Sequence, residues 1–221
     1  MKVELISYSK YNSNSNNHGE TKSIEDLVAY CARVSNPQNQ HNTETNEKLI
    51  HYLIKNNHWS PFEMVNICLE IETTRDIVRQ ILRHRSFSFQ EFSQRYAVAD
   101  LGFENREARI QDLKNRQNSI ETDNTLLSEQ WLKYQNDIID NSSKVYKWAI
   151  ENGIAKEQAR AVLPEGNTIS RIYMNGTLRS WIHYIQLRSG NGTQKEHRVV
   201  AIACADVISS IFPMIKQFIT K

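Results

Sequence analysis

The segment from Met64 to Glu72 alternates apolar and polar side chains, and this pattern is the clearest structural signal in the chain. Side chains of a β-strand point alternately to the two faces of a sheet, so the pattern predicts a strand with one buried face. Thr73 or Thr74 then offers an N-cap for a helix. That helix has an apolar stripe of Ile77, Val78, Ile81 and Leu82 and an arginine row of Arg75, Arg79 and Arg83. The chain therefore contains a half-buried strand that leads directly into an amphipathic helix.

The remaining segments predict an irregular order of strands and helices. Further strands are expected at 2–8, 86–96 and 168–174, and helices from Ser23 onward and at 45–55, 119–151, 154–163, 177–188 and 194–216. The polar stretch at 11–20 is typical of a loop, and Asn175–Gly176 of a turn. Because this order is not a regular βαβ alternation, we expect an α+β fold: one domain over residues 1–221, with a central antiparallel or mixed sheet flanked by helices.

The composition excludes several classes of protein. Lys and Arg number 27 against 25 Asp and Glu, and this near balance disfavours a protein that holds nucleic acid by bulk charge. The three cysteines lie far apart without paired spacing, and the seven histidines lack metal-ligand spacing, so we expect neither disulfides nor a metal site. No apolar signal segment or membrane span is visible. We expect a cytoplasmic protein, in the host cytoplasm if the source is viral, with no nucleic-acid or membrane partner.

Seven of the arginines fall between positions 75 and 109, and the run RHRSFSFQEFSQRY at 83–96 carries the densest group. Arg83 and Arg85 lie at the end of the predicted helix, while Glu91, Ser93 and Arg95 would share one face of the predicted strand. Guanidinium groups suit phosphate oxygens and the edges of planar heterocycles. The alternative interpretation is a solvated helix followed by an amphipathic strand. Arg75, Arg79, Arg106 and Arg109 are interpreted as structural or interface charges.

The same run resembles the signature of the flavin-dependent thymidylate synthases: Arg83-His84-Arg85, seven further residues, then Ser93 and Arg95. Three other blocks resemble this family in the same order along the chain. They are NHWSPFE at 57–63, KEQARAVLP at 156–164 and TLRSWIHYIQLR at 177–188. The resemblance implies reductive methylation of dUMP to dTMP, with methylenetetrahydrofolate as carbon donor, FAD as hydride carrier and NADPH as reductant. It also implies a homotetramer with active sites at subunit interfaces.

Site residues carried over from the resemblance fall into three groups. The catalytic residues are Arg188, expected beside the uracil ring, and His58. The dUMP-binding residues are Gln80, Arg83, Glu91, Ser93, Arg95, Arg160 and Arg188. The FAD-binding residues are Ser60, Arg83, His84, Arg85, Glu91, Thr177, Arg179 and His183, with Glu63 in support. Thr177 and His183 stand where many relatives have asparagine, and Gln90 also replaces an asparagine, so the FAD contacts are the part of the transfer most open to change.

The chemistry of the residues agrees with this resemblance. C5 of uracil is a poor nucleophile until electron density enters the ring, and a guanidinium beside the N3–O4 edge would stabilise the resulting negative charge. None of the three cysteines lies in a matching block, so a thiolate nucleophile is not implied. Trp181 and Tyr184 are interpreted as core residues.

Two other functions stay open at this point. One is a non-catalytic module that binds nucleotides or single-stranded nucleic acid, with Phe87, Phe89 and Phe92 as a stacking surface. The other is a degenerate relative that has lost turnover, against which the presence of Arg188 argues.

Overall fold

A four-stranded antiparallel sheet organises the chain, in a computed structural model that describes residues 1–11 and 23–220. In spatial order the strands are β1 (Lys2–Tyr8), β2 (Asn66–Thr74), β6 (Ile169–Thr177) and β3 (Phe87–Glu91), and each neighbouring pair is antiparallel. The α+β prediction with a central antiparallel sheet is confirmed. Past Tyr11, the loop predicted at 11–20 lies outside the described residues.

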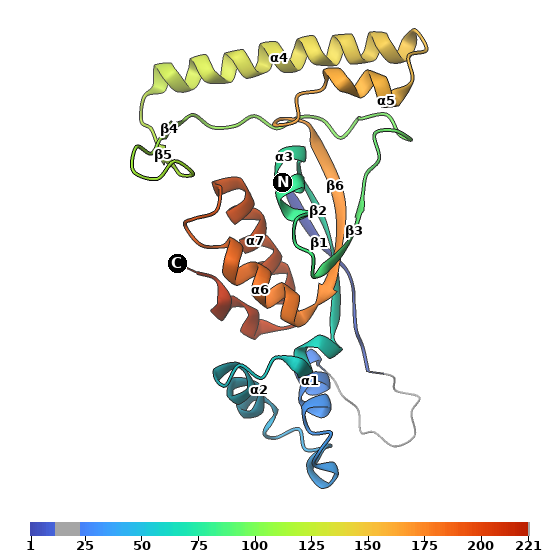
Figure 1. Cartoon of the computed structure of the whole chain (residues 1–221), viewed down its shortest axis with the longest axis vertical. Coiled ribbons are helices and arrows are strands. Elements are labelled where there is room, and N and C mark those ends of the chain that lie inside the picture. The colour runs from blue at the N-terminus through green and yellow to red at the C-terminus, as the bar shows by residue number, and fades with distance from the viewer. Residues whose placement is uncertain (12–22, 221) are drawn as a thin grey trace.

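Helices cover one side of this sheet and extend beyond both of its ends (Figure 1). They are α1 (Ile24–Ala32), α2 (Asn46–Lys55), α3 (Arg75–Ile81), α4 (Thr125–Glu151), α5 (Lys156–Ala159), α6 (Leu178–Arg188) and α7 (Lys195–Ile208). Short 3-10 segments are η1 (Pro37–Asn39), η2 (Ser60–Met64), η3 (Arg160–Val162) and η4 (Pro213–Phe218). Helices α6 and α7 pack beside the sheet, α1 and α2 lie at one end, and α4 crosses the other end. No helix in the described ranges is long and apolar enough to cross a membrane.

The core forms where the alternating face of β2 meets these helices. Ile67, Leu69 and Ile71 are fully buried, as their alternation predicts. Trp181 and Tyr184 of α6 are also fully buried, which confirms their assignment to the core. Burying each aliphatic side chain contributes about 1.5–3 kcal/mol, so this face accounts for much of the stability of the sheet.

The strand predicted at 86–96 is shorter than expected, because β3 ends at Glu91. The Phe92 amide still donates to Arg171 of β6, but the Tyr96 and Ala97 amides donate back to the Ser93 carbonyl. The chain therefore turns at Ser93, and the prediction that Glu91, Ser93 and Arg95 share one strand face is wrong.

The turn predicted at Asn175–Gly176 is also wrong, since both residues lie inside β6. Gly176 pairs with Phe87 of β3, and the Phe87 ring lies across it. A Cβ at position 176 would sit 2.4 Å from ring atom Cδ1, so this glycine serves close packing and not a turn.

Several helix boundaries differ from the predictions, while the N-caps agree. Ser23 accepts from the Asp26 amide in a capping box, and Thr177 accepts from the Ser180 amide. The helix predicted at 119–151 begins only at Thr125, because 119–121 forms strand β5 (Ser119–Glu121) against β4 (Arg109–Gln111). The segment predicted as one helix at 154–163 is α5 followed by η3, and the last helix ends at Ile208, with η4 after it.

Candidate active site

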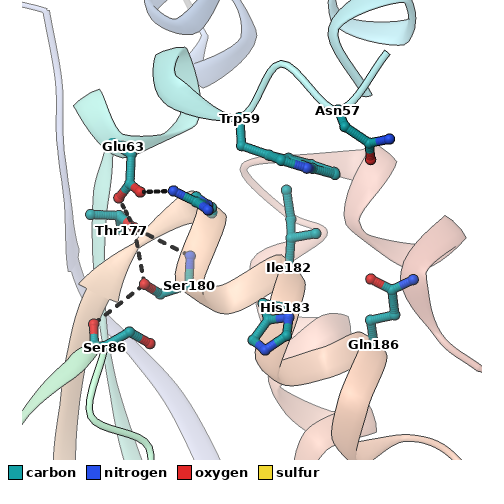
Figure 2. A pocket seen from close by; sticks show the side chains of 10 residues that line it. Asn57, Trp59, Glu63, Ser86, Thr177, Ser180, Ile182, His183 and Gln186 are labelled. Atoms are coloured by element: carbon teal, nitrogen blue, oxygen red, sulfur yellow. Dashed lines mark hydrogen bonds and ion pairs between the residues drawn. The ribbon is translucent and has the colours of Figure 1, made fainter. Parts of the chain in front are cut away.

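A cavity of about 690 Å³ opens between η2 and the first turns of α6 (Figure 2). Its lining residues are Asn57, Trp59, Glu63, Ser86, Thr177, Arg179, Ser180, Ile182, His183 and Gln186. They combine one large aromatic ring with amide, hydroxyl, carboxylate and guanidinium groups. Cavities of this size and composition are typical of cofactor and ligand sites.

One wall of the cavity is a hydrogen-bonded cluster around Glu63. Arg179 donates to Glu63 Oε1 at 2.7 Å, and the Thr177 hydroxyl donates to Glu63 Oε2 at 2.9 Å. Ser180 Oγ donates to the Ser86 carbonyl at 3.3 Å and so connects α6 with the start of β3. The cluster fixes the first turn of α6. The Leu178 amide there donates to the Val65 carbonyl and the Ser180 amide to Thr177 Oγ1, so the Arg179 guanidinium is the group that suits an anion such as a phosphate.

The opposite wall is apolar at its base and polar along α6. Trp59 packs against Phe62 with ring centroids 5.6 Å apart, and it faces Ile182 in Figure 2. His183 and Gln186 lie one turn apart on α6 and offer ring-nitrogen and amide groups. A flat apolar ring beside such donors and acceptors fits a flavin, whose heterocycle needs both kinds of contact.

A second polar cluster surrounds Arg188 at the end of α6. Arg188 Nε donates to His84 Nε2 at 2.9 Å, and the His84 ring stands edge-on to Tyr184 at 4.9 Å. Burial, together with the positive charges of Arg188 and Arg83, lowers the pKa of His84 to about 4. His84 is therefore neutral near pH 7 and accepts the Arg188 hydrogen bond, which fixes the direction of the guanidinium.

Arg95 and Arg160 meet at a third place, beside Glu157 of α5. Arg95 Nε lies 3.5 Å from Glu157 Oε2, and Arg160 Nε donates to the Glu157 carbonyl at 3.3 Å. The structure thus brings together two arginines that are 65 positions apart in the sequence (160 − 95). Each guanidinium group is suited to a phosphate.

The other residues predicted to bind dUMP or FAD either form hydrogen bonds within the protein or are exposed to solvent. Glu91 accepts from Arg75 and from the Ser170 hydroxyl, each at 3.2 Å. Gln80 donates to Gln194 at 2.7 Å. Arg83 and Arg85 are exposed on the connection between α3 and β3.

His58 is exposed and contacts the Tyr52 ring at 5.9 Å. In the described part of the chain, the cavity lining includes neither His58 nor Ser60. The predicted site residues therefore lie in separate groups, and this cavity collects only Thr177, Arg179 and His183, with Glu63.

The four arginines that the sequence analysis interpreted as structural or interface charges all form ion pairs within the protein. Arg75 pairs with Glu91, Arg106 with Asp76 at 2.8 Å, and Arg109 with Glu196 at 2.7 Å. Arg79 pairs with Glu165 at the surface. Most of the arginine cluster is thus used to hold the sheet, α3 and α7 together.

Sequence reasoning missed six of the lining residues: Asn57, Trp59, Ser86, Ser180, Ile182 and Gln186. Ser180 and Gln186 each lie three residues after a predicted site residue, Thr177 and His183, and so share their face of α6. This helical spacing could have identified them from the sequence. The sequence carried no such signal for Ser86, because only the pairing of β3 with β6 brings it to α6.

Within 1–11 and 23–220, no group of three or more His, Cys, Asp or Glu side chains is arranged to hold a metal.

The stacking surface required by the nucleic-acid module is not available. Phe87 is only 9% exposed, and its ring packs edge-on against Trp181 at 4.9 Å. Phe89 also packs against the core. These rings belong to the interior of the protein, so the structure does not favour the alternative.

Comparisons with known proteins agree with this arrangement. Residues 19–214 match the model of the family described as thymidylate synthase complementing protein. A flavin-dependent thymidylate synthase of Synechocystis is 49% identical over 89% of this chain and 90% of its own length. A probable flavin-dependent thymidylate synthase of Paramecium bursaria Chlorella virus 1 is 47% identical over 87% of this chain and 89% of its own.

A solved structure has the same fold. The UMP/dUMP methylase PolB of Streptomyces cacaoi, bound with 5-Br dUMP, superimposes with a TM-score of 0.80 at 25% identity, over 98% of this chain and 93% of its own. The sequence blocks, the cavity and these matches lead to one assignment. The chain belongs to the family of flavin-dependent thymidylate synthases.

Proposed function

We propose that this enzyme converts dUMP into dTMP by reductive methylation, with methylenetetrahydrofolate as carbon donor and NADPH as reductant. FAD, when bound, supplies the hydride that completes the methyl group. The observation that carries the proposal is the Arg188–His84 pair, in which a neutral histidine aims a guanidinium from the end of α6. We further propose that residues 1–221 act as one catalytic domain.

Arg188 is the residue proposed to activate the uracil ring. Among the described residues only its Nε is engaged, so the two terminal amino groups are left for a ligand. Beside the N3–O4 edge they would stabilise the negative charge that develops when electron density moves into the ring toward C5. His84 keeps this fork in one direction, which lowers the reorganisation required during the reaction.

The cysteines support a route without a thiolate. Burial raises the pKa of Cys31, Cys68 and Cys204, and the Cys204 thiol is fully buried. None of the three is therefore activated as a nucleophile at C6. All three are free thiols, which is also the state expected of a protein that acts in the cytoplasm.

The cavity of α6 is proposed to hold FAD. Arg179 would face its phosphates, and Trp59 would cover a heterocycle. Thr177, where many relatives carry asparagine, lines this cavity, and its hydroxyl donates to Glu63 and accepts from the Ser180 amide that it caps. Arg95 and Arg160 are proposed to bind the phosphate of dUMP.

A homotetramer is proposed because α4 exposes an apolar stripe. Its members recur at spacings of three and four residues along this helix and are exposed: Leu127, Trp131, Tyr134, Ile138, Val145 and Trp148. Figure 1 places α4 across one end of the molecule, where its own chain contacts it through α5, η3 and the hydrogen bonds of the buried Gln135 with Arg106 and Asn167. A stripe of this kind is typical of a helix that packs on a second helix. The proposed occupant is α4 of a second copy, and the separate groups of site residues would then be completed across subunits.

Substitution within the stripe tests the oligomer. We expect Trp131→Glu with Ile138→Glu to dissociate the tetramer in sedimentation velocity, because two charges would be buried in the seam. Leu126→Glu is the matched control, since Leu126 is exposed on α4 outside the stripe. An unchanged sedimentation coefficient in the double variant would show that α4 is not the interface.

The activity is tested by spectroscopy and by hydrogen release from C5. The purified protein should show flavin absorption that bleaches with NADPH, and it should release tritium from 5-tritiated dUMP only with methylenetetrahydrofolate and reduced flavin. Arg188→Gln should slow this release by about 100-fold. Arg198→Gln, an α7 arginine that donates to Asn191, is the control. A protein that binds neither added FAD nor dUMP would refute the proposal.

A further inference from the structure

A buried polar pair joins α6 to α7 beneath Arg188. The Tyr184 hydroxyl and His197 Nε2 lie 3.1 Å apart, and both side chains are fully buried. The surrounding core is aliphatic and aromatic, so a polar pair here is costly unless each of its groups is satisfied. Neither side chain belongs to the residues that sequence reasoning assigned to a ligand.

A hydrogen-bond chain leads to this pair from Glu196. Arg109 donates to both oxygens of Glu196, at 2.7 and 2.9 Å. Burial raises the pKa of Glu196, but hydrogen bonds from Arg109 and Gln194 outweigh it and hold the pKa below its ordinary value. An ionised carboxylate only accepts, so the amide nitrogen of Gln194 must face it, at 2.9 Å. The amide oxygen of Gln194 is therefore left to accept from Gln80 Nε2, at 2.7 Å.

The same logic fixes the tautomer of His197. Because Gln80 uses its nitrogen toward Gln194, its oxygen faces His197 Nδ1 at 3.2 Å, and that nitrogen must carry the proton. Nε2 is then bare and accepts from the Tyr184 hydroxyl. Burial raises the pKa of Tyr184 well above its ordinary value, so the hydroxyl stays protonated as the donor. Every hydrogen bond from Glu196 to Tyr184 thus runs in one direction.

The other side of the pair reaches Arg188. The Tyr184 ring meets the His84 ring at 4.9 Å, and the rings of His84 and His197 are 6.3 Å apart. His84 in turn accepts from Arg188. The buried pair therefore lies between Gln80 and Arg188, the two predicted nucleotide contacts that come from α3 and α6.

We propose that His197 and Tyr184 are positioning residues for dUMP binding. Gln194 decides which end of the Gln80 amide is the nitrogen, and His197 Nδ1–H holds the amide oxygen in place, so that the second N–H of Gln80 faces the nucleotide as a donor. Tyr184 holds His197 in the required tautomer and supports the His84 ring that aims Arg188. A reversed Gln80 amide would present an oxygen where the nucleotide also offers oxygens. This inference rests on the proposed function.

The test compares dUMP affinity with FAD affinity in the purified, flavin-loaded enzyme. Titration calorimetry with dUMP should show a dissociation constant about tenfold higher in His197→Leu, which lacks both ring nitrogens. His197→Asn should stay within about threefold of the natural protein, because its amide nitrogen replaces Nδ1 as the donor to Gln80. FAD affinity, measured by flavin fluorescence, should change in neither variant.

Two further variants separate positioning from general stability. Tyr184→Phe keeps the ring against His84 but removes the hydroxyl, and it should weaken dUMP binding by about threefold to tenfold. Val200→Ala, at a fully buried α7 position outside the hydrogen-bond chain, should lower stability without changing dUMP affinity. In the natural protein, nitrogen NMR of His197 should show a protonated Nδ1.

The outcomes distinguish this inference from the proposed function. If the natural enzyme binds no dUMP, the proposed function fails. If it binds dUMP and His197→Leu binds it equally well, or if Val200→Ala loses dUMP affinity to the same extent, the positioning inference alone is refuted. A protonated Nε2 with a bare Nδ1 would also refute it.

Discussion

Substitution of Gly176 by alanine tests how closely β3 and β6 pack beside the active site. The new Cβ would lie 2.4 Å from Phe87 Cδ1 and 2.6 Å from Cε1, far inside a normal contact. The Phe87 ring has little room to retreat, because it packs against Trp181 at 4.9 Å and Tyr184 at 6.0 Å, and both are fully buried. The ring or the strand must shift.

The expected cost follows from two opposing effects. Overpacking a filled core costs about 1–3 kcal/mol. Replacing glycine by alanine where the backbone permits it stabilises a protein by about 0.4–1 kcal/mol, because the unfolded chain has less conformational entropy to lose on folding. Gly176 is not in the left-handed region, so this gain applies here. We therefore expect Gly176→Ala to lower the free energy of unfolding by about 1–2 kcal/mol, which corresponds to a fall in Tm of about 2–8 °C.

The assay is urea unfolding followed by circular dichroism, at one protein concentration for every variant. A double-mutant cycle with Phe87→Leu identifies the cause, because the shorter side chain leaves space for the new methyl group. In that background the alanine should cost less than about 0.5 kcal/mol. If Gly176→Ala is as stable as the natural protein, or if its cost is the same with Phe87→Leu, the clash is not what requires glycine.

Three other predictions concern titration and binding. Burial lowers the pKa of His197 from 6.5 to about 3 and that of His84 from 6.5 to about 4. Between each lowered pKa and 6.5, the unfolded chain therefore binds more protons than the folded protein. The contribution of these two histidines to the free energy of unfolding should be complete above about pH 6.5 and should be lost progressively as the pH falls toward about 4, as measured by urea unfolding. The decline should be smaller in His197→Asn, and a free energy of unfolding that does not change over this range would contradict the prediction. Glu63→Gln should weaken FAD binding measured by fluorescence, because it removes the carboxylate charge that holds Arg179, while unchanged affinity would show that this ion pair is not needed. Arg160→Ala should raise the dissociation constant of dUMP about tenfold but leave that of deoxyuridine unchanged, and an equal loss for both would argue against a phosphate contact.

Local patterns in the sequence predicted the parts of the fold that depend on neighbouring residues. The alternation of β2 and the capping box at Ser23 are examples, because each is decided within a few positions. The end of β3 and the role of Gly176 were not predictable in this way. Both depend on which strand pairs with which, and this pairing joins residues about 90 positions apart, from 87 to 176. Strands β4 and β5 were missed because they are short and mostly exposed, with no apolar face to mark them.

The site was predictable to a similar extent. Thr177, Arg179 and His183, which the resemblance assigns to FAD, line one cavity, since α6 presents two of them and Thr177 is its N-cap; their role in FAD binding stays a prediction. Ser86 and His197 were not found, because their partners come from other elements and a sequence pattern cannot display such contacts. The predicted roles of Ser93 and Arg95 stay predictions, since the turn after β3 separates them from the strand that was expected to carry them.

The exposed stripe of α4 has a consequence for how the enzyme responds to dilution. A helix that is only partly covered by its own chain gains most of its stability from packing. If a second copy supplies that packing, folding and assembly become linked through mass action, and the unfolding temperature rises with protein concentration. The amount of enzyme in the cell would then help to decide how much of it is folded and active.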